Sequence, residues 1–476
     1  MTVRPSNRPD GPPPPRPCPV CGGLSRRVLH RQRFLDGPLG NGYDVVVCGS
    51  CGAGFADGIP SQAELDAYYA EQSKYTYDQT GGAESPYDFR RFELIADQVV
   101  PFLPSPAARI LDVGCATGGL LAVLQRRGFA NVLGVDPSAA CVAAARRLHG
   151  VDVRVAALGQ LADWSERFDA VLVVGVLEHL REVRPALEIV RRLLAPGGLL
   201  YCAQPDVAAF ADCVNAPYQQ FSVEHVNFFS ESSLHRLLAT CGLTPLRTWR
   251  WLVEWREGVT DSVVSGLYSP AAEVAGSKSQ VSGLPPFHTA APQISSSAAP
   301  ISEVPPLGSS GLSPTAEGAP RSPSLSPSPH LPQSLTPLLP LPSDLSIDGE
   351  TGPALVRYLA QCRAADAALI SVVERLVQSQ EPILVWGAGT LTRRLLATTN
   401  LGRANIAAFI DSNVGLQGHS LAGRAVLSPA QIAGRGEAIL IGSTAFAREI
   451  VHMIRSQLRL PNRVILLGAG GSLASE

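Results

Sequence analysis

Residues 108–128 read ARILDVGCATGGLLAVLQRRG, and this stretch decides the fold of the central part of the chain. An apolar run ending at Val113 predicts a strand, the glycines after it predict a turn, and the spacing of the following apolar residues predicts an amphipathic helix. Strand-like and helix-like segments then alternate to about Glu257. Such alternation is typical of a parallel sheet with helices on both faces, so we expect an α/β fold.

The turn after this strand favours a ligand that carries positive charge and no phosphate. It matches neither the G-x-G-x-x-G of a dinucleotide fingerprint nor the G-K-[ST] of a phosphate-binding loop, and it contains no lysine. Asp112 would repel a phosphate, but it suits the α-ammonium and sulfonium groups of S-adenosylmethionine. Gly114 and Gly118 would let the methionine part lie against backbone. Asp136, just past the next strand, is placed to accept hydrogen bonds from ribose hydroxyls, a feature shared with NAD enzymes.

Four segments in order carry a family resemblance: LDVGCATG, GVDPS, FDAVLVVGVLEHL and LAPGGLLYCAQP. They resemble the successive motifs of the class I S-adenosylmethionine-dependent methyltransferases. The resemblance implies that Asp112, Gly114 and Gly118 line the methionine side and that Asp136 holds the ribose. It also implies that residues near Leu158 and Gln160 flank the adenine. The alternative is a methyltransferase-like fold that has lost its cofactor.

Four cysteines form two Cys-x-x-Cys-Gly knuckles, with Cys18 and Cys21 in the first and Cys48 and Cys51 in the second. In each knuckle the glycine frees the backbone to turn, so that its amides can point at the thiolate sulfurs. Four thiolates in this pattern predict a closed, structural zinc site, with iron as the runner-up and paired thiols without metal as the alternative. A closed site has no open coordination position, so we expect no catalysis there.

A second glycine turn lies near the carboxyl end, where Gly387 and Gly389 are followed by Thr392, and Asp411 ends the next strand-like run. The pattern lacks the third glycine of a dinucleotide fingerprint. It is compatible with a nucleotide, including the diphosphate part of a sugar substrate, at a helix N-terminus. It is equally compatible with a Rossmann-like unit that binds nothing.

Composition sets the remaining bounds. The chain has 476 residues and a formal net charge of −2, which argues against a nucleic-acid or membrane-surface partner. We find no targeting segment and no apolar stretch long enough to span a bilayer, so a soluble, cytoplasmic protein is expected. We also find no clear seventh strand for the central sheet. The expected organisation is a disordered tail (1–17), a zinc-binding module (18–60), a class I methyltransferase domain with a helical lead-in (61–260), a disordered Pro/Ser-rich linker (261–350) and a C-terminal Rossmann-like domain (351–476).

Knuckles, methyltransferase core and C-terminal domain together resemble the three-domain sugar C-methyltransferases. This resemblance implies that Glu224 and His225 lie beside the substrate, with a histidine as base. Carbon methylation next to a ketone needs such a base, because an α-proton must leave to form an enolate. The alternative is a structural role for this pair. We interpret Glu178 and His179 as mainly architectural and close to the cofactor. Four tyrosines either close over a sugar or pack a helix: Tyr68, Tyr69, Tyr75 and Tyr77.

The leading hypothesis is therefore a zinc-containing methyltransferase that C-methylates a nucleotide-linked keto-deoxysugar. An O- or N-methyltransferase of a natural-product or polysaccharide intermediate is the alternative within the same class. Two alternatives from other classes are an oxidoreductase or epimerase that uses NAD at Gly387 and Gly389, and a non-catalytic zinc scaffold. The expected partner is a small molecule, with no nucleic acid or membrane. The sequence predicts no oligomeric state.

Overall fold

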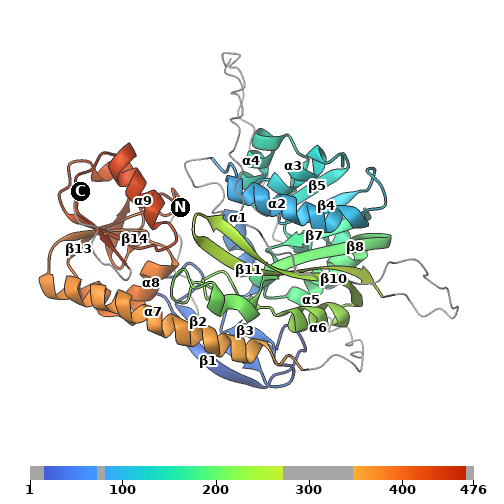
Figure 1. The fold of residues 1–476 in the computed structure, drawn as a ribbon, viewed down its shortest axis with the longest axis horizontal. Coiled ribbons are helices and arrows are strands. Elements are labelled where there is room, and N and C mark those ends of the chain that lie inside the picture. The colour runs from blue at the N-terminus through green and yellow to red at the C-terminus, as the bar shows by residue number, and fades with distance from the viewer. Residues whose placement is uncertain (1–14, 72–80, 272–346, 468–476) are drawn as a thin grey trace, which may run out of the picture. The chain divides into compact units, whose positions relative to one another are not determined.

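The computed structural model of the chain describes residues 15–71, 81–271 and 347–467. Most of the expected linker and of the expected N-terminal tail lies outside the described residues. No helix within the described ranges combines the length and the apolar character that crossing a membrane requires. The helices and strands form three sheets with their covering helices (Figure 1).

The central sheet has seven strands in the order β10-β11-β8-β7-β4-β5-β6. The neighbours from β8 to β6 pair in parallel, whereas β11 is antiparallel to both β8 and β10. The strands are β4 (Ile110–Val113), β5 (Val132–Asp136), β6 (Val153–Val155), β7 (Phe168–Val174), β8 (Leu194–Pro205), β10 (Leu243–Arg256) and β11 (Val259–Pro270).

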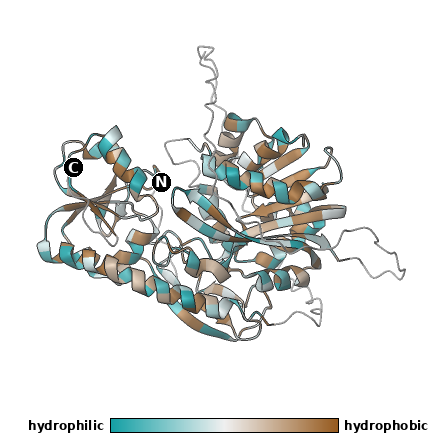
Figure 2. Cartoon of the chain, in the orientation of Figure 1, coloured by the Kyte–Doolittle hydropathy of each residue, from teal (hydrophilic) through white to brown (hydrophobic). Residues whose placement is uncertain are grey.

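Helices cover both faces of this sheet, as the alternating sequence pattern predicts (Figure 1). One buried cluster joins the sheet to α2, α3 and α4, and another joins its opposite face to α5 and α6. Figure 2 shows the corresponding division, with hydrophobic residues along the strands and hydrophilic residues on the outer sides of the helices. The helices are α2 (Pro86–Val99), α3 (Gly119–Arg126), α4 (Ala139–His149), α5 (Val183–Leu193) and α6 (Glu231–Thr240), and α1 (Gln62–Glu71) precedes them.

Strand β11 corrects two sequence expectations. It is the seventh strand that the sequence analysis did not find, and it extends to Pro270, so the linker boundary expected at residue 261 is wrong. The strand is buried although its sequence is polar. Asp261 accepts a hydrogen bond from Gln220 at 2.5 Å, and Ser265 donates one to Gln98 at 2.9 Å. Both partners, Gln220 and Gln98, lie far away in the sequence. Composition alone does not reveal them, and it therefore predicted a linker from residue 261.

The N-terminal module is an antiparallel sheet in the order β1-β2-β3-β9. Its last strand comes from far along the chain and pairs with β3. Arg16 is buried in this module, so the tail boundary expected at residue 17 is also wrong. The strands are β1 (Arg26–Arg33), β2 (Gly42–Cys48), β3 (Gly54–Asp57) and β9 (Asn227–Phe228).

The C-terminal segment begins with the long helix α7 (Thr351–Ser379) and continues as a six-stranded sheet in the order β14-β15-β13-β12-β16-β17. The first half of α7 packs with β2 and the loop before β9, and its second half packs with the C-terminal sheet. The remaining elements are β12 (Ile383–Trp386), α8 (Thr390–Thr398), β13 (Ile406–Ile410), β14 (Ser420–Leu421), β15 (Arg424–Leu427), β16 (Ala438–Ile441), α9 (Ala447–His452) and β17 (Val464–Leu466).

Short helical turns occupy several connections of the described chain. The 3₁₀ turns are η2 (Val100–Phe102), η3 (Leu158–Asp163), η4 (Leu177–His179), η5 (Val207–Asp212), η6 (Asn400–Arg403) and η7 (Pro429–Ile432), and η8 (Met453–Gln457) is π-helical. Two of them, η3 and η4, follow β6 and β7 at the carboxyl edge of the central sheet. Ligands of open parallel sheets bind at this edge.

Candidate active site and cysteine cluster

The turn between β4 and α3 presents bare backbone at the carboxyl edge of the central sheet. Gly114 and Gly118 have φ angles of +74° and +83°, in the region that favours glycine. A Cβ on Gly114 would lie 2.7 Å from a methyl group of Val176, and one on Gly118 would lie 2.8 Å from a methyl group of Val151. Both positions therefore need glycine.

Asp112 is a buried carboxylate on β4 directly before this turn. Within the described residues, its oxygens have no hydrogen-bond partner. Burial, and then the charge of Asp136, raise the pKa of Asp112 to about 7. A buried carboxylate without a partner is costly unless a cation or a proton joins it. The position thus fits the cationic group of the ligand that the sequence predicts.

Asp136 ends β5 and joins two loops at the same edge. Its carboxylate accepts hydrogen bonds from the backbone N–H of Ala116 at 3.0 Å and of Ser138 at 2.9 Å. Burial nevertheless raises its pKa. Ala116 has a φ of +49°, which the sequence did not indicate. Asp136 therefore holds the glycine turn in shape, and its contact with a ribose stays a prediction.

Leu158 and Gln160 lie in η3, which follows β6. Leu158 is buried in the core of the central sheet, whereas Gln160 is exposed. The side-chain oxygen of Gln160 accepts a hydrogen bond from the backbone N–H of Ala157 at 2.8 Å, so this side chain caps its own turn. Both residues are at the expected edge, and their contact with an adenine stays a prediction.

The two Glu-His pairs, which the sequence analysis treated separately, form one cluster. Glu178 and His179 are in η4, directly after β7 and beside the glycine turn of β4. The backbone N–H of Val226 donates to the carbonyl of Glu178 at 2.7 Å, and the His179 and His225 rings lie 5.0 Å apart. Since these contacts join residues 45 or more positions apart in the chain, no local pattern indicated them.

Tyrosines of α1 complete the described part of this cluster. The Tyr68 hydroxyl donates to Glu224 Oε1 at 2.8 Å, and the Tyr69 hydroxyl is 2.9 Å from His179 Nδ1. The same Nδ1 is 3.1 Å from the carbonyl oxygen of Glu224, which only accepts hydrogen bonds. When Nδ1 carries the proton, Nε2 is the basic nitrogen of His179. Tyr75 and Tyr77 lie outside the described residues.

The loop before β9, which carries Glu224 and His225, is held by elements that the sequence did not connect with it. Ser222 Oγ accepts hydrogen bonds from the backbone N–H of Glu224 at 3.2 Å and of His225 at 3.1 Å. The Tyr43 hydroxyl of β2 donates to the Ser222 carbonyl at 2.8 Å. From α7, the Tyr358 hydroxyl accepts the N–H of Gln220 at 3.0 Å. The N-terminal module and α7 thus both support the cluster of the two Glu-His pairs.

The four knuckle cysteines gather as predicted, and their ligand atoms all lie within 4.8 Å of one another. Cys18 Sγ is 3.7 Å from Cys51 Sγ, and Cys21 Sγ is 3.5 Å from Cys48 Sγ. Sulfur atoms bound to one tetrahedral zinc ion would be about 3.8 Å apart. Backbone N–H groups donate to Cys21 Sγ and Cys48 Sγ, both at 3.4 Å. The donor set and its geometry fit a structural zinc ion.

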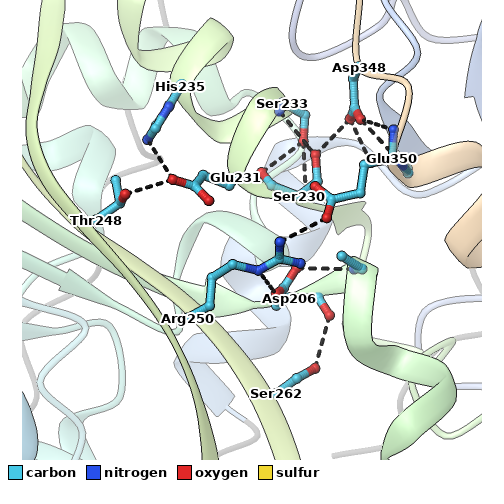
Figure 3. A network of polar contacts seen from close by, with 12 residues as sticks. Asp206, Ser230, Glu231, Ser233, His235, Thr248, Arg250, Ser262, Asp348 and Glu350 are labelled. Atoms are coloured by element: carbon cyan, nitrogen blue, oxygen red, sulfur yellow. Dashed lines mark hydrogen bonds and ion pairs between the residues drawn. The ribbon is translucent and has the colours of Figure 1, made fainter. Parts of the chain in front are cut away.

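A polar network holds Asp348 and Glu350, just before α7, against Ser230 and Arg250 (Figure 3). The backbone N–H of Asp348 donates to the Cys51 carbonyl at 2.9 Å. The Asp348 carboxylate accepts a hydrogen bond from the Ser230 hydroxyl at 2.8 Å. Arg250 bridges Asp206 at 2.7 Å and Glu350 at 2.8 Å. The segment just before α7 is therefore connected both to the cysteine cluster and to the central sheet.

The C-terminal glycine turn repeats part of the geometry of the first. Gly387 has a φ of +109°, and Asp411 accepts the backbone N–H of Ala388 at 2.8 Å, much as Asp136 accepts that of Ala116. Thr392 occupies the place of a third glycine, and its hydroxyl donates to the Gly387 carbonyl at 2.6 Å. The turn is formed as the sequence predicts, and a nucleotide there stays a prediction.

Comparison with known proteins adds a family to this geometry. Residues 87–248 match the model of a methyltransferase domain, and residues 379–466 match a C2185-like N-terminal domain. A ubiquinone biosynthesis O-methyltransferase from Cereibacter sphaeroides is 30% identical over 178 residues, which are 33% of this chain and 71% of that protein. Another, from Chelativorans sp., is 39% identical over 106 residues, 21% of this chain, and the match spans only 41% of its own length.

Solved structures give a similar but weaker likeness. The N-methyltransferase NodS from Bradyrhizobium japonicum, solved with S-adenosyl-L-homocysteine, matches with a TM-score of 0.32 and 17% identity. The match covers 45% of this chain and 100% of that one. The [4+2]-cyclase SpnF matches with a TM-score of 0.36 and 18% identity over 45% of this chain and 97% of its own.

Proposed function

Because the chain belongs to the S-adenosylmethionine-dependent methyltransferases, we propose that it transfers a methyl group at the carboxyl edge of its central sheet. Asp112 holds the cationic part of the cofactor, Gly114 and Gly118 admit its methionine portion, and Asp136 accepts its ribose hydroxyls. The support is the buried carboxylate of Asp112, which has no hydrogen-bond partner in the part of the chain that the structure describes and lies beside a turn whose glycines cannot carry side chains. When bound, the cofactor supplies an electrophilic methyl group, whose bond to sulfur breaks with the electron pair staying on sulfur.

The acceptor that we propose is a carbon next to the ketone of a nucleotide-linked keto-deoxysugar. The observation that carries this proposal is the cluster of His179, His225 and Glu224 beside the glycine turn. His225 takes the α-proton, and the electron pair of the C–H bond forms an enolate. As the enolate carbon bonds to the methyl group, the carbonyl re-forms. Histidine suits this step because its ordinary pKa lies near neutrality.

In our proposal, Tyr68 and Glu224 keep His179, the neighbour of this base, in place. The Tyr68 hydroxyl is bound to Glu224, and the Glu224 carbonyl lies against His179 Nδ1. The cluster therefore offers hydroxyl, carboxylate and imidazole groups together, which is the set needed to remove a proton and to stabilise the enolate oxygen. The Gly387 turn is the proposed contact for the nucleotide carrier.

A second candidate is O-methylation, and it is favoured by a specific observation: the relatives with 30 to 39% identity are named O-methyltransferases. In that reaction His225 would remove a hydroxyl proton, which is more acidic than a proton on carbon. A strong base is then less necessary, so loss of the His225 ring would lower the rate less.

We assign a structural zinc ion to Cys18, Cys21, Cys48 and Cys51 as part of the same proposal. The support is the match between their sulfur spacing and a tetrahedral site. All four cysteines serve as ligands, so the ion has no open position and takes no part in methyl transfer.

Two experiments test the proposed function. S-adenosylhomocysteine is titrated calorimetrically into the chain, into Asp136→Ala and into the matched control Asp411→Ala, which alters the other glycine turn. Binding that is weakened only by Asp136→Ala supports the site, and absence of binding to the unaltered chain refutes it. Methyl-labelled cofactor is then incubated with keto-sugar nucleotides and with phenolic acceptors, with and without His225→Gln. Mass spectrometry of the products distinguishes a new C–CH₃ bond from a new O–CH₃ bond.

A further inference from the structure

Asn227 lies on β9, two residues after His225, and its buried side chain reaches the turn that carries the other Glu-His pair. Its amide nitrogen donates to the carbonyl of Leu177 at 2.6 Å and to that of Leu180 at 2.8 Å. These two carbonyls lie on either side of Glu178 and His179 in the sequence. Both donors of the Asn227 amide are therefore used to hold that turn.

Arg16 determines which way the Asn227 amide faces. One nitrogen of its buried guanidinium group donates to Asn227 Oδ1 at 2.6 Å and to the Val226 carbonyl at 2.9 Å. Because a guanidinium group only donates, it selects the amide oxygen and leaves the amide nitrogen for the two carbonyls. Arg16 is held in turn by its backbone N–H, which donates to Asp57 at 2.9 Å, and by the ring of Phe55 at 5.2 Å.

These contacts add to the direct ones between the two turns. The Val226 N–H reaches the Glu178 carbonyl at 2.7 Å, and His179 Nδ1 lies 3.1 Å from the Glu224 carbonyl. Without the Asn227 amide, the Leu177 and Leu180 carbonyls lose buried donors, and the turn can shift relative to His225. A displacement of about 1 Å at a catalytic group can cost on the order of a hundredfold in rate.

From this geometry we infer that Asn227, oriented by Arg16, is a positioning residue. It keeps the His179 and His225 side chains in the relative position and orientation that proton removal requires. The inference rests on the proposed function of this cluster. It also gives the N-terminal module a role in the reaction, because Arg16 belongs to the module that contains the cysteine site. Neither residue needs to touch the substrate.

The NMR signals of the histidine rings test the inference, and the measurement needs no methyl-acceptor substrate. The full chain, saturated with S-adenosylhomocysteine, is labelled with ¹³C at the histidine Cε1 positions, and His179→Gln and His225→Gln assign the two signals. In Asn227→Ala and in Arg16→Ala, both signals should shift or broaden, whereas those of His149 and His235 should not. Arg184→Ala is the matched control, since Arg184 also donates to carbonyls of the N-terminal module but does not contact the cluster.

Arg16→Lys, which retains a charged donor, should restore part of the signal positions. Folded Asn227→Ala and Arg16→Ala proteins with unchanged His179 and His225 signals would overturn the inference. If Asn227→Ala does not fold, the Arg16→Ala and Arg16→Lys pair decides alone. A merely structural role would lower the melting temperature and leave both signals in place.

Turnover separates this inference from the proposed function. With an accepted substrate, Asn227→Ala should lower kcat by roughly ten- to a hundredfold while the affinity for S-adenosylhomocysteine stays unchanged. If His179→Gln and His225→Gln leave turnover intact, the proposed base fails, whatever the ring signals do. If these two variants abolish turnover, but Asn227→Ala neither lowers kcat nor shifts or broadens the histidine signals, the positioning role is refuted and the proposed base stands.

Discussion

Replacing Asp112 by Asn should stabilise the cofactor-free protein and weaken cofactor binding. Asp112 is buried and has no hydrogen-bond partner among the described residues, and its pKa rises from 3.8 to about 7 in the folded state. The folded chain therefore keeps this proton up to about pH 7, whereas the unfolded chain loses it near pH 3.8. Since the folded state binds more protons between these values, its stability falls as the pH rises from about 4 to 7.

The size of the effect follows from the same shift. About three pKa units at 1.36 kcal/mol each give a penalty of at most about 4 kcal/mol, complete above pH 7. Asp112→Asn removes the charge and keeps the shape. In urea unfolding without cofactor, the variant should gain up to about 4 kcal/mol at pH 8 and almost nothing near pH 4.

Cofactor binding should change in the opposite direction. Losing one partner of a buried charge pair costs about 2 kcal/mol or more, which is at least about thirtyfold in the dissociation constant of S-adenosylhomocysteine at pH 8. Between pH 8 and pH 6 the unaltered chain should lose roughly tenfold more affinity than the variant, because protonation neutralises Asp112. Calorimetry is done on both proteins at each pH. The effect of protonation of the ligand's own amine is the same for both, so it cancels in the comparison.

Asp261→Asn is the matched control. Burial also raises the pKa of Asp261 to about 7, but this residue lies on β11 and accepts a hydrogen bond from Gln220. The control should alter stability and leave cofactor affinity unchanged. The reasoning is refuted if Asp112→Asn binds S-adenosylhomocysteine as tightly as the unaltered chain and is no more stable at pH 8.

Three further predictions concern other parts of the chain. The purified protein should contain one zinc ion per chain when measured by inductively coupled plasma emission spectrometry. Cys21→Ser should lose this zinc ion, whereas the control Cys213→Ser should keep it. Zinc retained in Cys21→Ser would contradict the four-cysteine site. Asp348→Ala should lower the free energy of unfolding by roughly 2 to 4 kcal/mol, because it leaves buried donors unpaired, and a change within error in urea unfolding would count against this. Titration of S-adenosylhomocysteine should give one site per chain, and a stoichiometry of two would mean that the C-terminal turn also binds it.

The sequence predicted those features whose signal is local. The glycine turn at Gly114 and the cysteine knuckles are each encoded within a few residues, so their positions followed directly. The seventh strand was missed because Asp261 and Ser265 are polar and find their partners, Gln220 and Gln98, far away in the chain. Arg16 was taken for part of a disordered tail because nothing near it indicates Asn227 as its partner.

The cluster of the two Glu-His pairs shows the same limit at the candidate site. Sequence spacing identified both Glu-His pairs, but it gave them separate roles and read Glu178 and His179 as mainly architectural. The two pairs meet because η4 follows β7, the neighbour of β4 in the sheet, and because the backbone N–H of Val226 donates a hydrogen bond to the Glu178 carbonyl. Contacts between segments this far apart in the sequence are determined by the packing of the whole fold, so local sequence patterns do not predict them.

The two glycine turns indicate why one of them suits a cationic cofactor. Both begin alike, since Gly114 donates its N–H to Val135 and Gly387 donates to Ile410, each just before an acid that accepts a loop amide. Aligned on these glycines, the position of Asp112 in β4 corresponds to Val385 in β12, which is fully buried. A valine offers no charge to an ammonium or sulfonium group. The acids that end the second strands preserve the shape of each turn. In our proposal, the buried carboxylate of Asp112 gives only the first turn a preference for a cation.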